Sequence, residues 1–99
     1  MKEEELKNLI KEVIGNDDPF WNIPVYNVVK KIIDLPDNSE SSIATLVDDE
    51  NQKNTKFMFE IDKCVTEVCK RINIILDKSK CNGQFIGLPF AIPFIKKRK

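Results

Sequence analysis

The sequence of 99 residues predicts a single α+β domain in which helices come first and a β-hairpin comes last. Apolar residues recur at helical spacing in the first half, and again over about four turns from Phe57 to Ile72. After Ile72 the pattern changes to β-formers on both sides of the turn dipeptide Asn82-Gly83. Apolar residues make up 41% of the chain, which supports one core but not a deep, water-excluding active site.

The first predicted helix covers residues 3–14. Three glutamates at residues 3–5 complement the positive end of its dipole, and Gly15-Asn16 ends it. Its apolar stripe consists of Leu6, Leu9, Ile10, Val13 and Ile14.

The second predicted helix runs from about Pro24 to Asp34, because proline is well tolerated in a first turn. Residues 35–38 stop it. The segment before it, residues 17–22, is expected to be a polar turn followed by an aromatic anchor, in which Phe20 and Trp21 pin the first two helices together. The apolar stripe of this helix is Val25, Val28, Val29, Ile32 and Ile33.

The third predicted helix is short, and it ends in the acidic run at residues 48–50. Asp37 with Glu40, or one of the three serines at positions 39, 41 and 42, can cap it. Its buried face is expected to be Ile43, Ala44, Leu46 and Val47.

The fourth predicted helix carries the strongest periodic signal, with Thr55 as its N-cap. Residues 74–76 should then form a strand, residues 77–84 a polar tip, and residues 85–95 a return strand. Pro89 and Pro93 cannot donate to a ladder, so the return strand is expected at a sheet edge or as a broken arm. The long apolar face comprises Phe57, Met58, Ile61, Cys64, Val65, Val68, Cys69 and Ile72.

Charge is unevenly divided along the chain. Residues 1–50 carry twelve acidic and five basic side chains, a net of −7, whereas residues 51–99 carry four and eleven, a net of +7. The second half ends in a basic tail over residues 96–99. A basic face on a small domain is the footprint of a polyanion binder, nucleic acid first; the alternative is a charged surface that only maintains solubility.

Candidate DNA-binding residues fall into three groups. Around the start of the long helix, several side chains are suited to phosphate contact. Few side chains further along are suited to base readout, because Glu60, Asp62 and Glu67 place negative charges on the helix. The hairpin tip can enter a minor groove or lie along phosphates, and the tail can follow the backbone. An ordinary polar turn and a solvated chain end remain the alternatives for these two. The candidates are Lys53, Asn54, Thr55, Lys56, Lys63, Lys78, Lys80, Asn82, Gln84, Lys96, Lys97 and Arg98.

Catalysis and cofactor binding lack their usual residues, so we expect no enzyme and no cofactor. The chain has no histidine and no glycine-rich phosphate loop. Its three cysteines are odd in number and lack CxxC spacing, which favours free thiols in a reducing cytosol over a metal site. The acidic, amphipathic N-terminus does not read as a signal peptide, and no apolar run is long enough to span a membrane.

The order of these elements resembles the winged helix-turn-helix over residues 24–95. That resemblance implies a brief strand near Asn38–Glu40, a hairpin that acts as the wing, and residues 3–14 as an added N-terminal helix. The connection over residues 48–54 is longer than the usual turn of three or four residues. The composition, rich in Lys, Asn and Ile and without His, is similar to that of proteins from low-GC Gram-positive bacteria or their mobile elements. The size, the order of elements and the basic wing are similar to those of TcpK-like accessory proteins of clostridial conjugative plasmids. This resemblance implies a homodimer that binds the origin of transfer, contacts DNA mainly through its wing and assists a relaxase; the cytoplasmic location is expected from the N-terminus and the cysteines.

Two other functions fit the same sequence. The acidic half can serve a protein-interaction module, such as a phage inhibitor or an assembly adaptor, by mimicking DNA. A transcriptional repressor of the same fold differs from the first reading in its target site. Dimerisation is expected for DNA binding because one small module buries too little DNA for a specific site.

Overall fold

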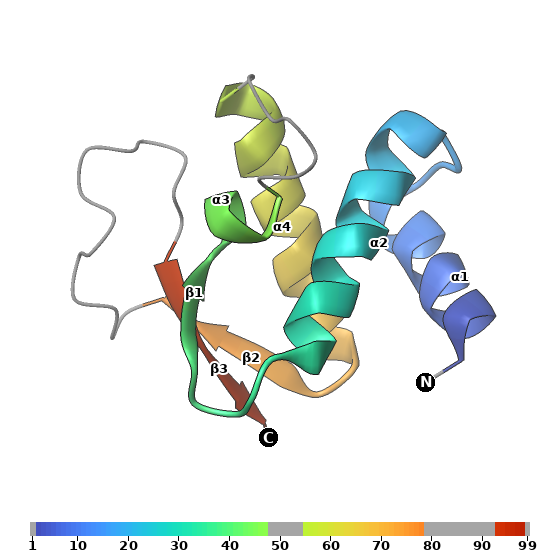
Figure 1. Ribbon diagram of the computed structural model, residues 1–99. Coiled ribbons are helices and arrows are strands. Elements are labelled where there is room, and N and C mark those ends of the chain that lie inside the picture. Colours follow the sequence, from blue (N-terminus) through green and yellow to red (C-terminus); the bar gives the residue numbers. More distant parts are fainter. Residues whose placement is uncertain (1, 48–54, 79–92, 99) are drawn as a thin grey trace.

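The computed structural model describes residues 2–47, 55–78 and 93–98, and for residues 55–59 only the backbone. These residues form four helices and one antiparallel sheet of three strands (Figure 1). The predicted α+β class is therefore confirmed. In chain order the elements are α1 (Glu3–Ile14), α2 (Pro19–Asp34), β1 (Glu40–Ser42), α3 (Ile43–Leu46), α4 (Thr55–Arg71), β2 (Ile74–Asp77) and β3 (Pro93–Arg98).

Helix α1 has the predicted bounds and the predicted end. Gly15 adopts the left-handed conformation, with φ of 87°, and its N–H donates to the Lys11 carbonyl at 2.8 Å. Only glycine takes this conformation without strain, so residue 15 ends the helix at low cost. Leu6 and Ile10 form the buried part of the helix.

Helix α2 begins five residues before the predicted start, at Pro19 rather than about Pro24. Asp18 is the N-cap, and its Oδ1 accepts from the Phe20 N–H at 3.0 Å. An aspartate cap followed by proline at the first helical position is a stronger start signal than a lone proline. Pro24 lies inside the helix, where it has no N–H for an intrahelical bond and its ring disfavours the usual position of the carbonyl four residues earlier.

The prediction that Phe20 and Trp21 together form an aromatic anchor is correct for Trp21 only. The Trp21 side chain is partly buried against the core, but Phe20 is 64% exposed and meets Trp21 edge to face, with ring centroids 5.1 Å apart. Trp21 alone therefore pins the start of α2 to the core.

Between α2 and α4 the chain forms a turn, a strand and a short helix. Asn38 takes a left-handed conformation, with φ of 66°, and β1 follows two residues later than expected. Ser42, one of the serines proposed as a cap, accepts from the Thr45 N–H at 3.0 Å and starts α3. Helix α3 ends at Leu46, and the buried Val47 follows it. The predicted end at residues 48–50 and the connection to residue 54 lie outside the described residues.

Helix α4 lies where the apolar periodicity from Phe57 to Ile72 predicted a long helix. Thr55 is the first residue of the helix and not the capping residue before it. The apolar face buries Ile61, Val65, Val68 and Cys69, with Cys64 and Ile72 packed at its margin.

The sheet has the order β1-β3-β2, so the return strand is central and not at an edge. The described strand β3 covers Pro93–Arg98 and so ends three residues beyond the predicted end at residue 95, while the predicted residues 85–92 lie outside the described residues. Pro93 fits a central strand because it takes the first position, opposite Ser42. Ser41 pairs with Phe94, and Leu76 with Lys96. Residues 96–98, predicted as a basic tail, are therefore the middle and end of a paired strand.

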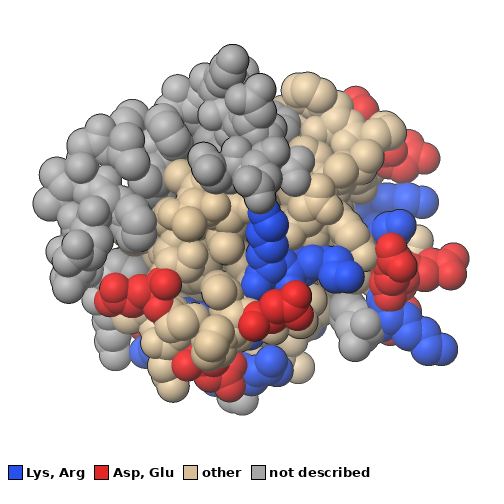
Figure 2. All heavy atoms as spheres, in the orientation of Figure 1, with Lys and Arg blue, Asp and Glu red and all other residues tan. Residues whose placement is uncertain are grey.

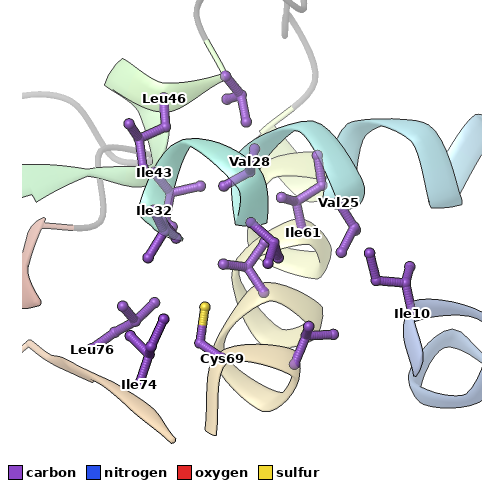
Figure 3. Close-up of a cluster of buried hydrophobic side chains, with 14 of the residues drawn as sticks. Ile10, Val25, Val28, Ile32, Ile43, Leu46, Ile61, Cys69, Ile74 and Leu76 are labelled. Atoms are coloured by element: carbon purple, nitrogen blue, oxygen red, sulfur yellow. The ribbon is translucent and has the colours of Figure 1, made fainter. Parts of the chain in front are cut away.

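The core lies between α2, α4 and the inner face of the sheet, and α1 closes one side (Figure 3). Within the described part, no helix is both long enough and apolar enough to cross a membrane. The buried apolar residues are Leu6, Ile10, Val25, Val28, Val29, Ile32, Ile43, Leu46, Val47, Ile61, Val65, Val68, Cys69, Ile74, Leu76 and Phe94.

Candidate nucleic-acid interface

The N-terminal end of α4 is the first predicted DNA-binding region. Thr55 and Lys56 lie in the first turn of the helix, whose unpaired N–H groups and dipole favour a phosphate. Lys53 and Asn54 precede the helix, outside the described residues. The predicted positions Lys80, Asn82 and Gln84 of the hairpin tip also lie outside them.

Lys63 is exposed on α4, about two turns from the start of the helix. It borders a hollow of about 390 Å³ whose other walls include Ile14, Trp21 and Glu60. No ionic partner of Lys63 occurs among the described residues. Among the described residues, no acidic side chain therefore competes with an anion for its ammonium.

Lys78 follows β2 and turns back onto α4 instead of facing outward. Its ammonium lies 2.7 Å from both carboxylate oxygens of Asp62 and 3.1 Å from the Thr66 hydroxyl. Asp62 is mostly covered, since 14% of its side chain is exposed. This pairing disfavours Lys78 as a phosphate contact, because a carboxylate already engages its charge.

Lys96 is fully buried, with 0% of its side chain exposed. Its ammonium donates to the carbonyls of Ile33 at 3.0 Å and Leu35 at 2.6 Å, at the C-terminal end of α2. A cation there complements the negative end of the helix dipole. The assignment of Lys96 to a DNA-binding tail is therefore wrong: the alternation of β3 directs this side chain into the core.

Lys97 and Arg98 also have acidic partners. The Lys97 ammonium lies 3.1 Å from Asp77, on the neighbouring strand, and the Arg98 Nε donates to Asp37 at 3.0 Å. The pair of Arg98 and Asp37 is half exposed, so it is weak and readily exchanged for other partners. The pair of Lys97 and Asp77 is largely covered, with 33% and 18% of the two side chains exposed, as is the pair of Lys78 and Asp62. These two residues stay near the surface, but as part of a sheet and not of a tail.

The acidic first half and the basic second half of the sequence do not form separate acidic and basic faces in the described part. Besides the pairs of β3, Arg71 bonds Glu67 on its own helix at 2.9 Å and Glu12 of α1 at 3.4 Å. Figure 2 shows acidic and basic side chains side by side on the face in view. Glu12 and Asp37 of the acidic first half thus pair with basic residues of the second half. Asp62, Glu67 and Asp77 pair with basic residues inside the second half itself.

Two ion pairs of α4 lie outside the predictions from the sequence. The sequence predicts Asp62 as an acid that disfavours base readout, whereas in the structure it anchors Lys78. The spacing of Asp62 and Thr66, four residues apart on one helix face, is a signal for a shared contact, but the partner sixteen residues away is not. The pairing of Glu67 with Arg71 follows the same spacing and was readable from the sequence.

Cys64 and Cys69 are free thiols, and Cys81 lies outside the described residues. Burial raises the pKa of Cys69 from 9.0 to about 12, and the nearby Lys96 lowers it only in part. Burial, followed by the charge of Glu60, also raises the pKa of Cys64. Neither thiol is therefore activated as a nucleophile. Over the residues that the structure describes, no three Cys, Asp or Glu side chains gather as metal ligands.

Comparison with known proteins adds no identity: no protein-family model, no curated protein and no solved structure matches the chain.

Proposed function

We propose that this chain is a winged helix-turn-helix protein that binds double-stranded DNA without catalysing a reaction on it. The observation that supports the proposal is topological. From α2 onward the order is helix, strand, helix, helix, strand, strand, and the early strand β1 pairs with the last strand β3. In this reading α3 and α4 are the helix-turn-helix, β2 and β3 flank the wing, and α1 is an added helix.

The proposed DNA contacts are narrower than the sequence alone predicted. The N-terminal end of α4 meets phosphates through Thr55 and Lys56, with Lys53 and Asn54 before it and Lys63 further along. Lys80, Asn82 and Gln84 belong to the connection between β2 and β3 and serve as the wing contacts. Lys78 and Lys96 are left out, because the first is paired with Asp62 and the second is buried.

Within this class we propose a role on a bacterial mobile element, as a homodimeric accessory protein that binds the origin of transfer beside a relaxase. The resemblance to TcpK-like proteins supports this narrower proposal. A repressor of the same fold would use the same contacts at another site. A protein-interaction role is favoured by one observation, the exposed Phe20 and Ile23 in the acidic half.

The test of DNA binding is a titration of a fluorescent mixed-sequence duplex at several salt concentrations, followed by anisotropy. Counterion release predicts that affinity falls steeply between about 50 and 200 mM salt. Lys63→Gln should lower the slope of log affinity against log salt by about 0.9, as expected for one lost phosphate contact. Lys70→Gln is the matched control, an exposed lysine on the same helix about 10 Å further from its start. No binding at low salt, or a flat salt response, overturns the proposal.

A further inference from the structure

The outer face of α1 and α2 exposes large apolar side chains. Phe20 is 64% exposed and Ile23 54%, three residues apart at the start of α2. In the described part, the other large apolar side chain with comparable exposure is Ile75 on β2, at 40%. Removing large apolar side chains from water is favourable, so a pair of them on one helix face favours a partner.

A groove of about 390 Å³ lies beside these side chains, between α1 and α2. Ile10 and Ile23 supply apolar lining, Tyr26 supplies an aromatic ring, and Lys7 and Lys11 are on the α1 side. We call the groove together with Phe20 the α1–α2 face. Its complete lining is Lys7, Ile10, Lys11, Asp17, Pro19, Asn22, Ile23 and Tyr26.

The α1–α2 face is held in place by its own contacts. The ammonium groups of Lys7 and Lys30 lie 5.3 and 5.8 Å from the centre of the Tyr26 ring. Asn22 donates to the carbonyls of Asn16 at 3.1 Å and Asp18 at 2.9 Å, which fixes the turn between the helices. A surface ordered in this way loses little entropy when a partner binds.

Charges of both signs surround the groove, although residues 1–50 as a whole are strongly acidic. Lys7 and Lys11 lie on it, Lys7 pairs with Glu3 at 3.2 Å, and Asp17 stands at its end. Hydrogen bonds from Lys7 and then from Tyr26 lower the pKa of Glu3. A strongly acidic or strongly basic partner would meet like charge on part of this face. A second copy brings both signs, and a two-fold axis lets each lysine approach an acid of the other copy.

We propose that two copies of this chain associate through the α1–α2 face around a two-fold axis, with Phe20 and Ile23 as the central apolar contacts. The inference rests on the proposed function, since it supplies the interface of the dimer that DNA binding requires. In Figure 1, α1 and the sheet lie on opposite sides of α2 and α4. Association through α1 and α2 therefore leaves β2 and β3 open to DNA.

The test measures mass in solution without DNA, so it fails separately from the test of DNA binding. The full chain has a mass of 11.5 kDa, and sedimentation at about 50 µM should give twice that value. Phe20→Glu combined with Ile23→Glu should give the monomer mass, with the dissociation constant raised at least about 100-fold. Glutamate is a good helix former and is favoured near a helix start, so α2 should persist.

The control variant is Ile75→Thr, which reduces the other exposed apolar side chain on β2 and should leave the dimer intact. The single variant Ile23→Gln should shift the dissociation constant in the same direction by a smaller factor, which guards against misfolding of the double variant. Circular dichroism should match the parent protein in each case. A monomeric parent protein at about 50 µM, or a double variant that stays dimeric, overturns the proposal.

Discussion

The ammonium of Lys96 donates to the Leu35 carbonyl at 2.6 Å, so a side chain of β3 closes the C-terminal end of α2. The same lysine donates to Ile33, and its backbone is bonded to the turn that follows the helix: its N–H to Ser39 at 3.0 Å, and its carbonyl to the Asn38 N–H at 2.6 Å. One residue of the central strand thus fixes both the helix end and the entry to β1.

Replacing Lys96 with methionine should lower the free energy of unfolding by about 2–3 kcal/mol. Methionine fills a similar volume but leaves the α2 carbonyls without their donor in a site closed to water. Urea unfolding followed by circular dichroism measures the loss. Lys70→Met, at an exposed position of α4, is the control and should change stability by less than about 0.5 kcal/mol. An equally small loss at residue 96 would show that water or another donor satisfies these carbonyls.

The pair of Asp62 and Lys78 should show measurable coupling. Both carboxylate oxygens are engaged at 2.7 Å and Asp62 is mostly covered, so the pair should exceed an open surface pair. In a double-mutant cycle with Asp62→Asn and Lys78→Met, we expect about 1–2 kcal/mol of coupling in the free energy of unfolding. The exposed pair of Glu3 and Lys7, measured in the same way, should give a clearly smaller coupling, because water screens it. Coupling near zero for Asp62 and Lys78 would return Lys78 to the set of possible DNA contacts.

The helices were largely predictable from the sequence because each depends on local signals. Gly15 ends α1, and the apolar period of α4 gave the long helix. The start of α2 was missed because Pro24 was treated as a first-turn residue, although Asp18 and Pro19 carried the better signal. The cost of an internal proline was overridden by the buried stripe that continues through Val25 and Val28.

The site was harder to predict because the wrongly assigned side chains make contacts with residues that are distant in the sequence. Nothing near Lys96 in the sequence indicates that it caps a helix ending about 60 residues earlier. Lys96 lies two residues after Phe94, on the same buried face of β3. This spacing predicts a buried lysine only once Pro93 is known to start a central strand. Charge composition likewise counts charged residues but does not show how they pair. From composition, Lys78 and Arg98 are candidates for phosphate contact, whereas in the structure they pair with Asp62 and Asp37.

The stability of the protein should fall with pH in the alkaline range through Cys69. Its pKa is about 12 in the fold and 9.0 in the reference state, so between these values the unfolded chain releases a proton that the folded chain keeps. The stabilisation is complete below pH 9 and decreases toward pH 12, with a limiting slope of about 1.4 kcal/mol per pH unit.

Unfolding free energies measured from pH 8 to 11 test this slope. Lysine and tyrosine side chains titrate in the same window, so the informative quantity is the difference from Cys69→Ala. That variant should be less stable than the parent protein at pH 8, and the gap should narrow as the pH rises. A constant gap would mean that the thiol ionises equally in the folded and unfolded chain.

Under the proposed function, the wing should contribute more to DNA affinity than the exposed face of α4. Lys63 has Glu60 nearby on its helix and Glu67 one turn further, and both repel phosphates, whereas Lys80 and Gln84 flank the small Gly83 without an acid between them. At about 100 mM salt, Lys80→Ala combined with Gln84→Ala should weaken binding about tenfold, and Lys63→Ala about threefold. Anisotropy titrations of one duplex compare the two, with Lys70→Ala as the control that leaves affinity unchanged. Equal losses, or a larger loss at Lys63, would assign the main contact to α4, because the dipole and N–H groups at its start would then outweigh the acids along it.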